Sequence, residues 1–160
     1  MVMESPRPTR KEFDAFVRRV EPRLRAALVA AYGPADGREA TVEALSWAWE
    51  HWARLDDVAH PVGYLFRVGQ SAVRRFGSRP LPIELTQILE QRSPEFEPEL
   101  LPALASLPVQ QRTVALLVHA YGWSQAEVAE LLGISPSTVH EHLRRGLARL
   151  REHLEVGYVP

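Results

Sequence analysis

The chain has 160 residues, of which 46% are hydrophobic and 24% are charged, and its formal net charge is only −1. This length and apolar content are sufficient for one packed domain or two small ones. The sequence contains no cysteine, which excludes disulfides and thiolate metal sites. It also has no apolar run that could serve as a signal core or span a bilayer. We therefore expect a cytoplasmic protein without a cofactor, a metal site or a membrane partner.

A first helix is predicted to begin at Thr9, because Thr9 and Glu12 have the spacing of a capping box. Apolar residues follow at helical spacing as far as Tyr32. Pro22 lies inside this segment and is expected either to bend the helix or to restart it. The pair Gly33-Pro34 then breaks the chain.

Two more helices are predicted before residue 80. Asp36 is expected to cap the second helix, with Glu39 placed to complete a capping box. This helix continues to about Ala53. Pro61 begins the third helix, because proline is well tolerated in a first helical turn. The third helix is expected to stop at Gly77.

The second helix carries three tryptophans, Trp47, Trp49 and Trp52. On a helix Trp49 shares a face with Leu45 and Trp52, so we predict that Trp49 packs mainly in the core. Trp47 lies four residues after Glu43, on another face. A bundle of this size cannot bury all three rings, so we predict that Trp47 and Glu43 face a partner protein.

Cations and aromatic residues are interleaved along the third helix. They are Tyr64, Phe66, Arg67, Arg74, Arg75, Phe76 and, just beyond the helix, Arg79. Aromatic rings that stack on bases, set among cations that contact the backbone, are typical of single-stranded DNA binding. A basic helix whose aromatic residues pack in the protein's own core would show the same pattern. This segment alone does not distinguish between the two interpretations.

The segment that follows has the composition of a linker. Its prolines lie among charged residues and are Pro80, Pro82, Pro94 and Pro98. We predict one short helix near residues 84–90 within it. The chain is thus divided into an N-terminal domain at residues 9–79, a linker at 80–98 and a C-terminal domain at 99–155. The predicted fold class is all-α, with two small helical modules that fold separately on a tether.

The C-terminal domain is predicted to contain a helix-turn-helix. Ser124 and Glu127 form a capping box that begins one helix, and Gly133 supplies the left-handed residue that ends it. Ser135 caps the next helix, and Pro136 lies in its first turn. Only a short glycine-containing turn separates the two helices, as this motif requires.

The second helix of this motif has an apolar face and a polar face. The apolar stripe is Val139, Leu143, Leu147, Leu150 and Leu154. We predict that the polar face contacts duplex DNA through Ser135, Ser137, Thr138, His140, Glu141, Arg144, Arg145 and Arg149. Early residues of such a helix meet base edges, and later arginines meet phosphates. The alternative is an ordinary helical hairpin whose polar face is only solvated.

The charge balance differs between the two halves of the chain. Residues 1–80 contain 13 Lys and Arg and 10 Asp and Glu, a formal net charge of +3. Residues 81–160 contain 6 Lys and Arg and 10 Asp and Glu, a formal net charge of −4. Because DNA affinity grows with the number of phosphates neutralised, the helix-turn-helix alone is expected to bind duplex DNA weakly. It needs a partner or a second module.

The C-terminal motifs resemble region four of the sigma factors of bacterial RNA polymerase, in particular the small extracytoplasmic-function (ECF) group. The resemblance is strongest at residues 107–112 (LPVQQR), 124–139 and 145–151 (RGLARLR). In the family, region four reads the minus-thirty-five promoter element. His140 and His142 stand where a Lys and an Arg are common in the family.

The N-terminal module resembles region two of the same family, so that the resemblance covers about residues 10–153. It rests on residues 44–52 (ALSWAWEHW) and 61–68 (PVGYLFRV). In the family, region two binds the clamp helices of the polymerase β′ subunit and captures the melted minus-ten element.

Region two also departs from the family's pattern. Glu43 matches the family's Glu, Val42 stands at the position of a Gln, and Glu39 takes the place of an Asp. Ser71 stands where an Asn is typical.

The resemblance implies two further sets of site residues. Those implied to bind polymerase are Glu39, Glu43 and Trp47. Those implied to bind the melted element are Tyr64, Arg67, Gln70, Arg74 and Arg75. The implied partners are the β′ and β subunits of core RNA polymerase and promoter DNA, and an anti-sigma protein is a further candidate.

Two other hypotheses remain beside a sigma factor. A sigma-derived regulator could bind DNA without directing polymerase, and the departures at Val42, His140 and His142 favour it. An enzyme is disfavoured, because the sequence shows no nucleophile–base signature and no glycine-rich phosphate loop. We therefore expect a protein that is not an enzyme.

Overall fold

The computed structural model describes residues 7–76 and 100–157. The N-terminal part forms α1 (Arg10–Tyr32), α2 (Pro34–Glu50), the short 3-10 helix η1 (Trp52–Arg54) and α3 (Pro61–Phe76). The C-terminal part forms α5 (Leu100–Ser106), α6 (Val109–Ala115), the π-helical segment η2 (Leu116–Ala120), α7 (Gln125–Leu132) and α8 (Pro136–Gly157). The described ranges contain helices and turns but no strand, which confirms the all-α prediction.

Helix α1 begins and continues as its sequence requires. The Thr9 backbone N–H donates to Glu12 Oε2 over 2.8 Å, and the Glu12 backbone N–H donates to Thr9 Oγ1 over 3.3 Å, so the capping box is confirmed. The helix runs unbroken through Pro22. Pro22 lies on the exposed side, where water can satisfy the Arg18 carbonyl that the missing N–H of proline leaves unpaired.

The turn between α1 and α2 is a single residue. Gly33 has φ 90° and ψ 169°, and Pro34 is the first residue of α2. Asp36 is therefore not the cap of this helix, contrary to the sequence-based prediction; it lies in the first turn and is buried. The reason is that proline, with its φ already fixed, begins a helix without a side-chain cap. The helix also ends at Glu50, before the predicted Ala53.

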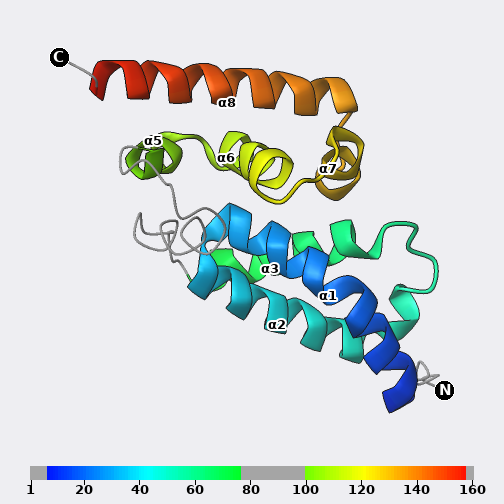
Figure 1. Ribbon diagram of the computed structural model, residues 1–160. Helices are drawn as coiled ribbons and strands as arrows, with labels where there is room; N and C mark the ends of the chain where they lie inside the picture. Colours follow the sequence, from blue (N-terminus) through cyan, green and yellow to red (C-terminus); the bar gives the residue numbers. More distant parts are fainter. Residues whose placement is uncertain (1–6, 77–99, 158–160) are drawn as a thin grey trace.

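Each part of the chain has a buried apolar centre. Leu24, Leu28, Leu65 and Phe66 are almost completely buried among α1, α2 and α3. In the C-terminal part Val114, Leu117, Val128 and Val139 are fully buried. In Figure 1, α5, α6 and α7 lie between α8 and the N-terminal helices.

The two parts pack against each other and contribute to one hydrophobic core. Helix α1 contacts α6 and η2, and α3 contacts α7. At this interface the buried Arg112 guanidinium donates from Nη2 to the Ala31 carbonyl oxygen over 3.1 Å. These contacts join residues far apart in the sequence, so the two parts pack together and are not joined by the tether alone; that each part folds separately stays a prediction. The predicted helix near residues 84–90 lies outside the described residues, and the boundaries 9–79, 80–98 and 99–155 stay predictions.

Candidate nucleic-acid interface

The helix-turn-helix has the geometry that its capping residues predict. The Ser124 backbone N–H donates to Glu127 Oε2 over 2.8 Å, and the Glu127 N–H donates to Ser124 Oγ over 3.1 Å. Gly133 is left-handed, with φ 66° and ψ 35°, and ends α7. The Thr138 backbone N–H donates to Ser135 Oγ over 3.2 Å, so Ser135 caps α8. All three sequence signals at this turn are confirmed.

Helix α8 is held by its apolar stripe and leaves its polar side in solvent. Val139, Leu143 and Leu150 are buried against the helices beneath, as predicted. Glu141 is partly buried. The residues predicted to meet duplex DNA that are exposed are Ser135, Ser137, Thr138, His140, Arg144, Arg145 and Arg149. The first three turns of α8 therefore present a continuous polar surface.

Glu141 connects the two arginines of this surface. It accepts hydrogen bonds from Arg144 Nε and Nη2, over 3.1 and 2.8 Å, and from Arg145 Nε over 2.8 Å. These bonds, first from Arg144 and then from Arg145, lower the pKa of the Glu141 carboxyl to about 2. The carboxylate is therefore charged at any pH at which DNA binding is studied.

Replacing Arg144 and Arg145 together by alanine is expected to weaken duplex binding equally on all sequences. Both arginines are exposed, and later arginines of a recognition helix are expected to contact phosphates. The slope of log affinity against log salt is expected to fall by about 1–2, at about 0.9 per phosphate contact. Replacing Ser137 or Thr138 is expected to change which sequences are preferred. Fluorescence anisotropy on several duplexes measures both effects. If the arginine variant changed the sequence preference and the Ser137 and Thr138 variants changed only the affinity, these assignments would be reversed.

One side of α3 gathers the residues implied to bind the melted strand. Arg67, Arg74 and Arg75 are exposed, and Tyr64 and Gln70 are half-buried at the edges of this basic strip. The Tyr64 ring lies 5.4 Å from the Trp47 ring, measured between centroids. This strip therefore carries one accessible aromatic ring among three cations.

The other aromatic residues of α3 belong to the fold. Phe66 is only 2% exposed and lies in the core, and Phe76 packs against the same core. Core packing accounts for Phe66, and Phe76 and Tyr64 are both half-buried against the core. That Tyr64 stacks on a base of the melted strand stays a prediction.

Helix α2 presents an exposed strip beside α3. Its members, at helical spacing, are Glu39, Val42, Glu43, Ser46 and Glu50. Val42 is 63% exposed, more than any other large hydrophobic residue of the described chain. Glu43 Oε2 lies 4.0 Å from Arg75 Nη2, so the acidic strip of α2 and the basic strip of α3 adjoin.

Both tryptophans of α2 are half-buried, and the core placement predicted for Trp49 is wrong. Trp49 is not in the core; it is half-buried, and its ring packs edge-to-face with the Phe13 ring, with 5.0 Å between the ring centroids. Trp47 is half-buried as well, packs against the core and stacks on His51 at 4.4 Å. The reason is that the buried line of α2 consists of alanines four residues apart, ending at Ala48, so the rings at positions 47 and 49 fall on its two flanks.

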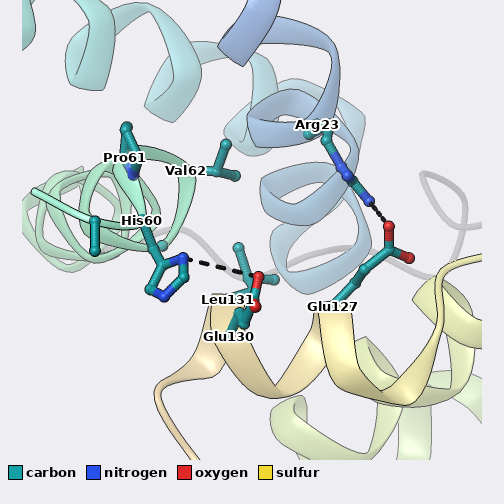
Figure 2. A pocket seen from close by; sticks show the side chains of 9 residues that line it. Arg23, His60, Pro61, Val62, Glu127, Glu130 and Leu131 are labelled. Atoms are coloured by element: carbon teal, nitrogen blue, oxygen red, sulfur yellow. Dashed lines mark hydrogen bonds and ion pairs between the residues drawn. The ribbon is translucent and has the colours of Figure 1, made fainter.

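A pocket of about 160 Å³ lies where α3 approaches α7. Figure 2 shows an ion pair of Arg23 with Glu127 at 2.8 Å and a contact of His60 Nδ1 with Glu130 Oε2 at 3.8 Å. The Arg23 guanidinium also lies 4.5 Å from the centre of the Trp123 ring. Hydrogen bonds from Arg23 and from the Ser124 backbone lower the pKa of Glu127 to about 2. Sequence reasoning did not find these contacts between the two parts.

Comparison with known proteins agrees with this geometry. Residues 99–150 match the family model for sigma-70 region 4. The RNA polymerase sigma-E factor of Streptomyces coelicolor is 32% identical over 152 residues, covering 89% of this chain and 86% of that protein. The ECF RNA polymerase sigma factor SigL of Mycobacterium tuberculosis is 28% identical over 134 residues, covering 76% of each chain.

The chain belongs to the bacterial RNA polymerase sigma factors of the ECF group. It therefore has a role in transcription initiation.

Solved structures show that the whole fold of this sigma factor is shared. The sigma factor RpoE of Bartonella quintana, in complex with the anti-sigma factor NepR, superposes with a TM-score of 0.60 over 92% of this chain and 99% of its own, at 20% identity. CnrH, in complex with the cytosolic domain of CnrY, superposes with a TM-score of 0.63 over 94% of this chain and 92% of its own, at 24% identity. None of the helices in residues 7–76 and 100–157 combines the length and hydropathy needed to span a bilayer.

Proposed function

We propose that this sigma factor directs core RNA polymerase to promoters through three surfaces. The exposed strip of α2 binds the polymerase, the basic strip of α3 binds the melted minus-ten element, and the polar side of α8 binds the minus-thirty-five element. The observation that carries the proposal is the arrangement of α8, whose apolar stripe is buried while the residues of its first turns are exposed.

The surfaces of α2 and α3 support the N-terminal assignments. Glu39 and Glu43 flank the exposed Val42, which suits a partner surface that combines apolar and basic residues. The adjoining strip of α3 offers Arg67, Arg74 and Arg75 to a backbone and the Tyr64 ring to a base. A factor that holds polymerase beside the melted strand needs these two surfaces next to each other.

Binding to both promoter elements requires the two parts to separate. Elements about 25 base pairs apart are roughly 85 Å apart along the duplex at about 3.4 Å per base pair. In the packed arrangement α3 contacts α7 directly. The chain between Phe76 and Leu100 can extend to roughly 80 Å at about 3.3–3.6 Å per residue. We therefore propose that the interface between the two parts opens when polymerase is bound.

A sigma-derived regulator that no longer binds polymerase is the second candidate. The observation in its favour is Val42, an exposed apolar residue where the family's region two has a Gln. An anti-sigma protein is a further proposed partner, because the solved structure of RpoE described above is a complex with the anti-sigma factor NepR.

Replacing Glu43 by alanine is expected to lower affinity for core polymerase at least tenfold and to leave the melting temperature nearly unchanged. Glu43 is exposed, so its loss leaves no buried group unpaired in the free protein. Trp47→Ala is expected to lower both quantities, because the ring also packs on His51 and Tyr64. Surface plasmon resonance and thermal melting measure the two effects.

The matched control for this experiment is Glu152→Ala, which removes an exposed acid from α8, away from the proposed polymerase surface. Equal affinity for core polymerase in Glu43→Ala and the wild type would contradict the role of α2. If the wild type itself showed no affinity for core polymerase, the regulator would be the better interpretation.

A further inference from the structure

Glu141 occupies the position that a DNA phosphate would take on Arg144. The Arg144 guanidinium presents a planar pair of donors, and both Glu141 oxygens accept from it: Nε to Oε2 over 3.1 Å and Nη2 to Oε1 over 2.8 Å. Arg145 Nε adds a third bond to Oε1 over 2.8 Å. A guanidinium binds phosphate through the same pair of N–H donors, in two parallel hydrogen bonds, so carboxylate and phosphate compete for Arg144.

The carboxylate also reduces the charge that α8 presents to a duplex. Arg144, Arg145 and Glu141 together carry +1, where the arginines alone would carry +2. The C-terminal half of the chain is already acidic, with a balance of −4. Because duplex affinity on any sequence depends on neutralised phosphates, Glu141 lowers the part of the affinity that is independent of sequence.

One acceptor site of Glu141 remains for a base. A carboxylate offers about four lone-pair sites, and three are used by the two arginines, two on Oε1 and one on Oε2. Glu141 lies in the second turn of α8, three and four residues after Thr138 and Ser137, on the side that early helix residues turn toward the bases. In the major groove, Glu accepts from the N4 amino group of cytosine.

We infer that Glu141 makes recognition by α8 selective. Its carboxylate competes with phosphates for Arg144 and Arg145 on every duplex, and it accepts a hydrogen bond from a cytosine amino group on the preferred one. At guanine or thymine the charged oxygen would face the carbonyl acceptor O6 or O4, and at adenine the N7 acceptor lies beside the N6 donor, which disfavours those bases relative to cytosine. This inference rests on the proposed binding of α8 to the minus-thirty-five element.

The test compares Glu141→Gln with Glu152→Gln in the full chain. Both substitutions remove one negative charge from the same side of α8, since eleven residues are close to three helical turns. The two sites are about 16 Å apart along the axis, beyond the Debye length of about 10 Å at 0.1 M salt. Glu152 is exposed. A general effect of net charge would therefore appear in both variants, and a local effect only in the first.

Anisotropy titrations on a duplex of random sequence, from low to moderate salt, give the first readout. Glu141→Gln is expected to raise affinity about five- to tenfold and to steepen the salt slope by about 1, whereas Glu152→Gln changes affinity less than twofold. In a chain that also carries Arg144→Ala and Arg145→Ala, Glu141→Gln is expected to have no such effect. Equal gains from the two glutamine variants, or weaker binding by Glu141→Gln, would overturn the inference.

Selection from randomised duplexes gives the second readout. The wild type is expected to require cytosine at one position, and Glu141→Gln is expected to lose that requirement and shift toward adenine, the base that Gln contacts in two bonds. An unchanged preference at every position would overturn the role in base recognition. If the wild type binds no duplex even at low salt, the proposed function of α8 is contradicted. If it binds duplexes but Glu141 does not affect which sequences it prefers, only the inference about Glu141 is contradicted.

Discussion

Replacing Gly37 by alanine is expected to destabilise the protein by about 2–3 kcal/mol, at the upper part of the range for overpacked cores. A Cβ at this position would lie 2.6 Å from the Cα and N atoms of Val29 and 2.8 Å from the carbonyl carbon of Leu28. These are backbone atoms of α1, which cannot rotate away, so α1 and α2 would have to move apart. The melting temperature is expected to fall by roughly 5–10 °C, at about 2–4 °C per kcal/mol for a chain of this size.

The matched control is Gly146→Ala, the same substitution in helix α8. There the new Cβ would meet Gln111 at 3.5 Å, an ordinary contact distance. Because alanine favours a helix over glycine by about 1 kcal/mol, this variant is expected to be neutral or slightly more stable. Urea unfolding of both variants checks the contrast. If Gly37→Ala were as stable as Gly146→Ala, the close approach of α1 and α2 would be wrong.

Replacing Arg112 by methionine is expected to cost about 2–4 kcal/mol of stability. Arg112 is 5% exposed, and its guanidinium donates from Nη2 to the Ala31 carbonyl at the end of α1. Helix α1 has no basic residue of its own in its last turn, so Arg112 supplies the cation that the negative end of the helix attracts. Burial lowers the pKa of the Arg112 guanidinium, which shows the desolvation that these contacts offset. Methionine keeps the apolar stem and leaves the carbonyl unpaired, which costs about 1–3 kcal/mol.

The control for this variant is Arg25→Met. Arg25 is exposed on α1 and pairs with Glu21 one turn away at 2.9 Å, a contact of the kind that contributes about 0–1 kcal/mol. Urea unfolding gives the stabilities, and small-angle scattering gives the dimensions of the chain. Arg112→Met is expected to be less stable and more extended than Arg25→Met. Identical scattering and stability in the two variants would mean that Arg112 does not hold the two parts together.

The features that the sequence predicts well are those encoded within a few residues. The capping boxes at Thr9 and Ser124 and the left-handed Gly133 each depend on side chains three or four positions apart or on one backbone conformation. The apolar stripe of α8 is equally local, because its period identifies the buried side without knowledge of what covers it.

The features that the sequence does not predict depend on what each helix packs against. The alanine line of α2 is less conspicuous than its tryptophans, so the sequence pattern predicts the Trp49 ring in the core, whereas Ala48 is the residue that faces it. The interface between the two parts joins Arg23 to Glu127, 104 positions apart, and Arg112 to Ala31, 81 positions apart. A pairing between isolated charges at such separations has no periodic or compositional signature.

Transcription with core polymerase purified from the source bacterium, freed of other sigma factors, tests the central claim most directly. Fragmented genomic DNA serves as template, and the 5′ ends of the transcripts are sequenced with and without this chain. We predict new start sites that depend on the chain, with two shared elements upstream, and their loss when Glu43 is replaced by alanine. Binding of the chain to duplex DNA with no chain-dependent start sites would contradict a sigma factor that directs polymerase and would favour the sigma-derived regulator.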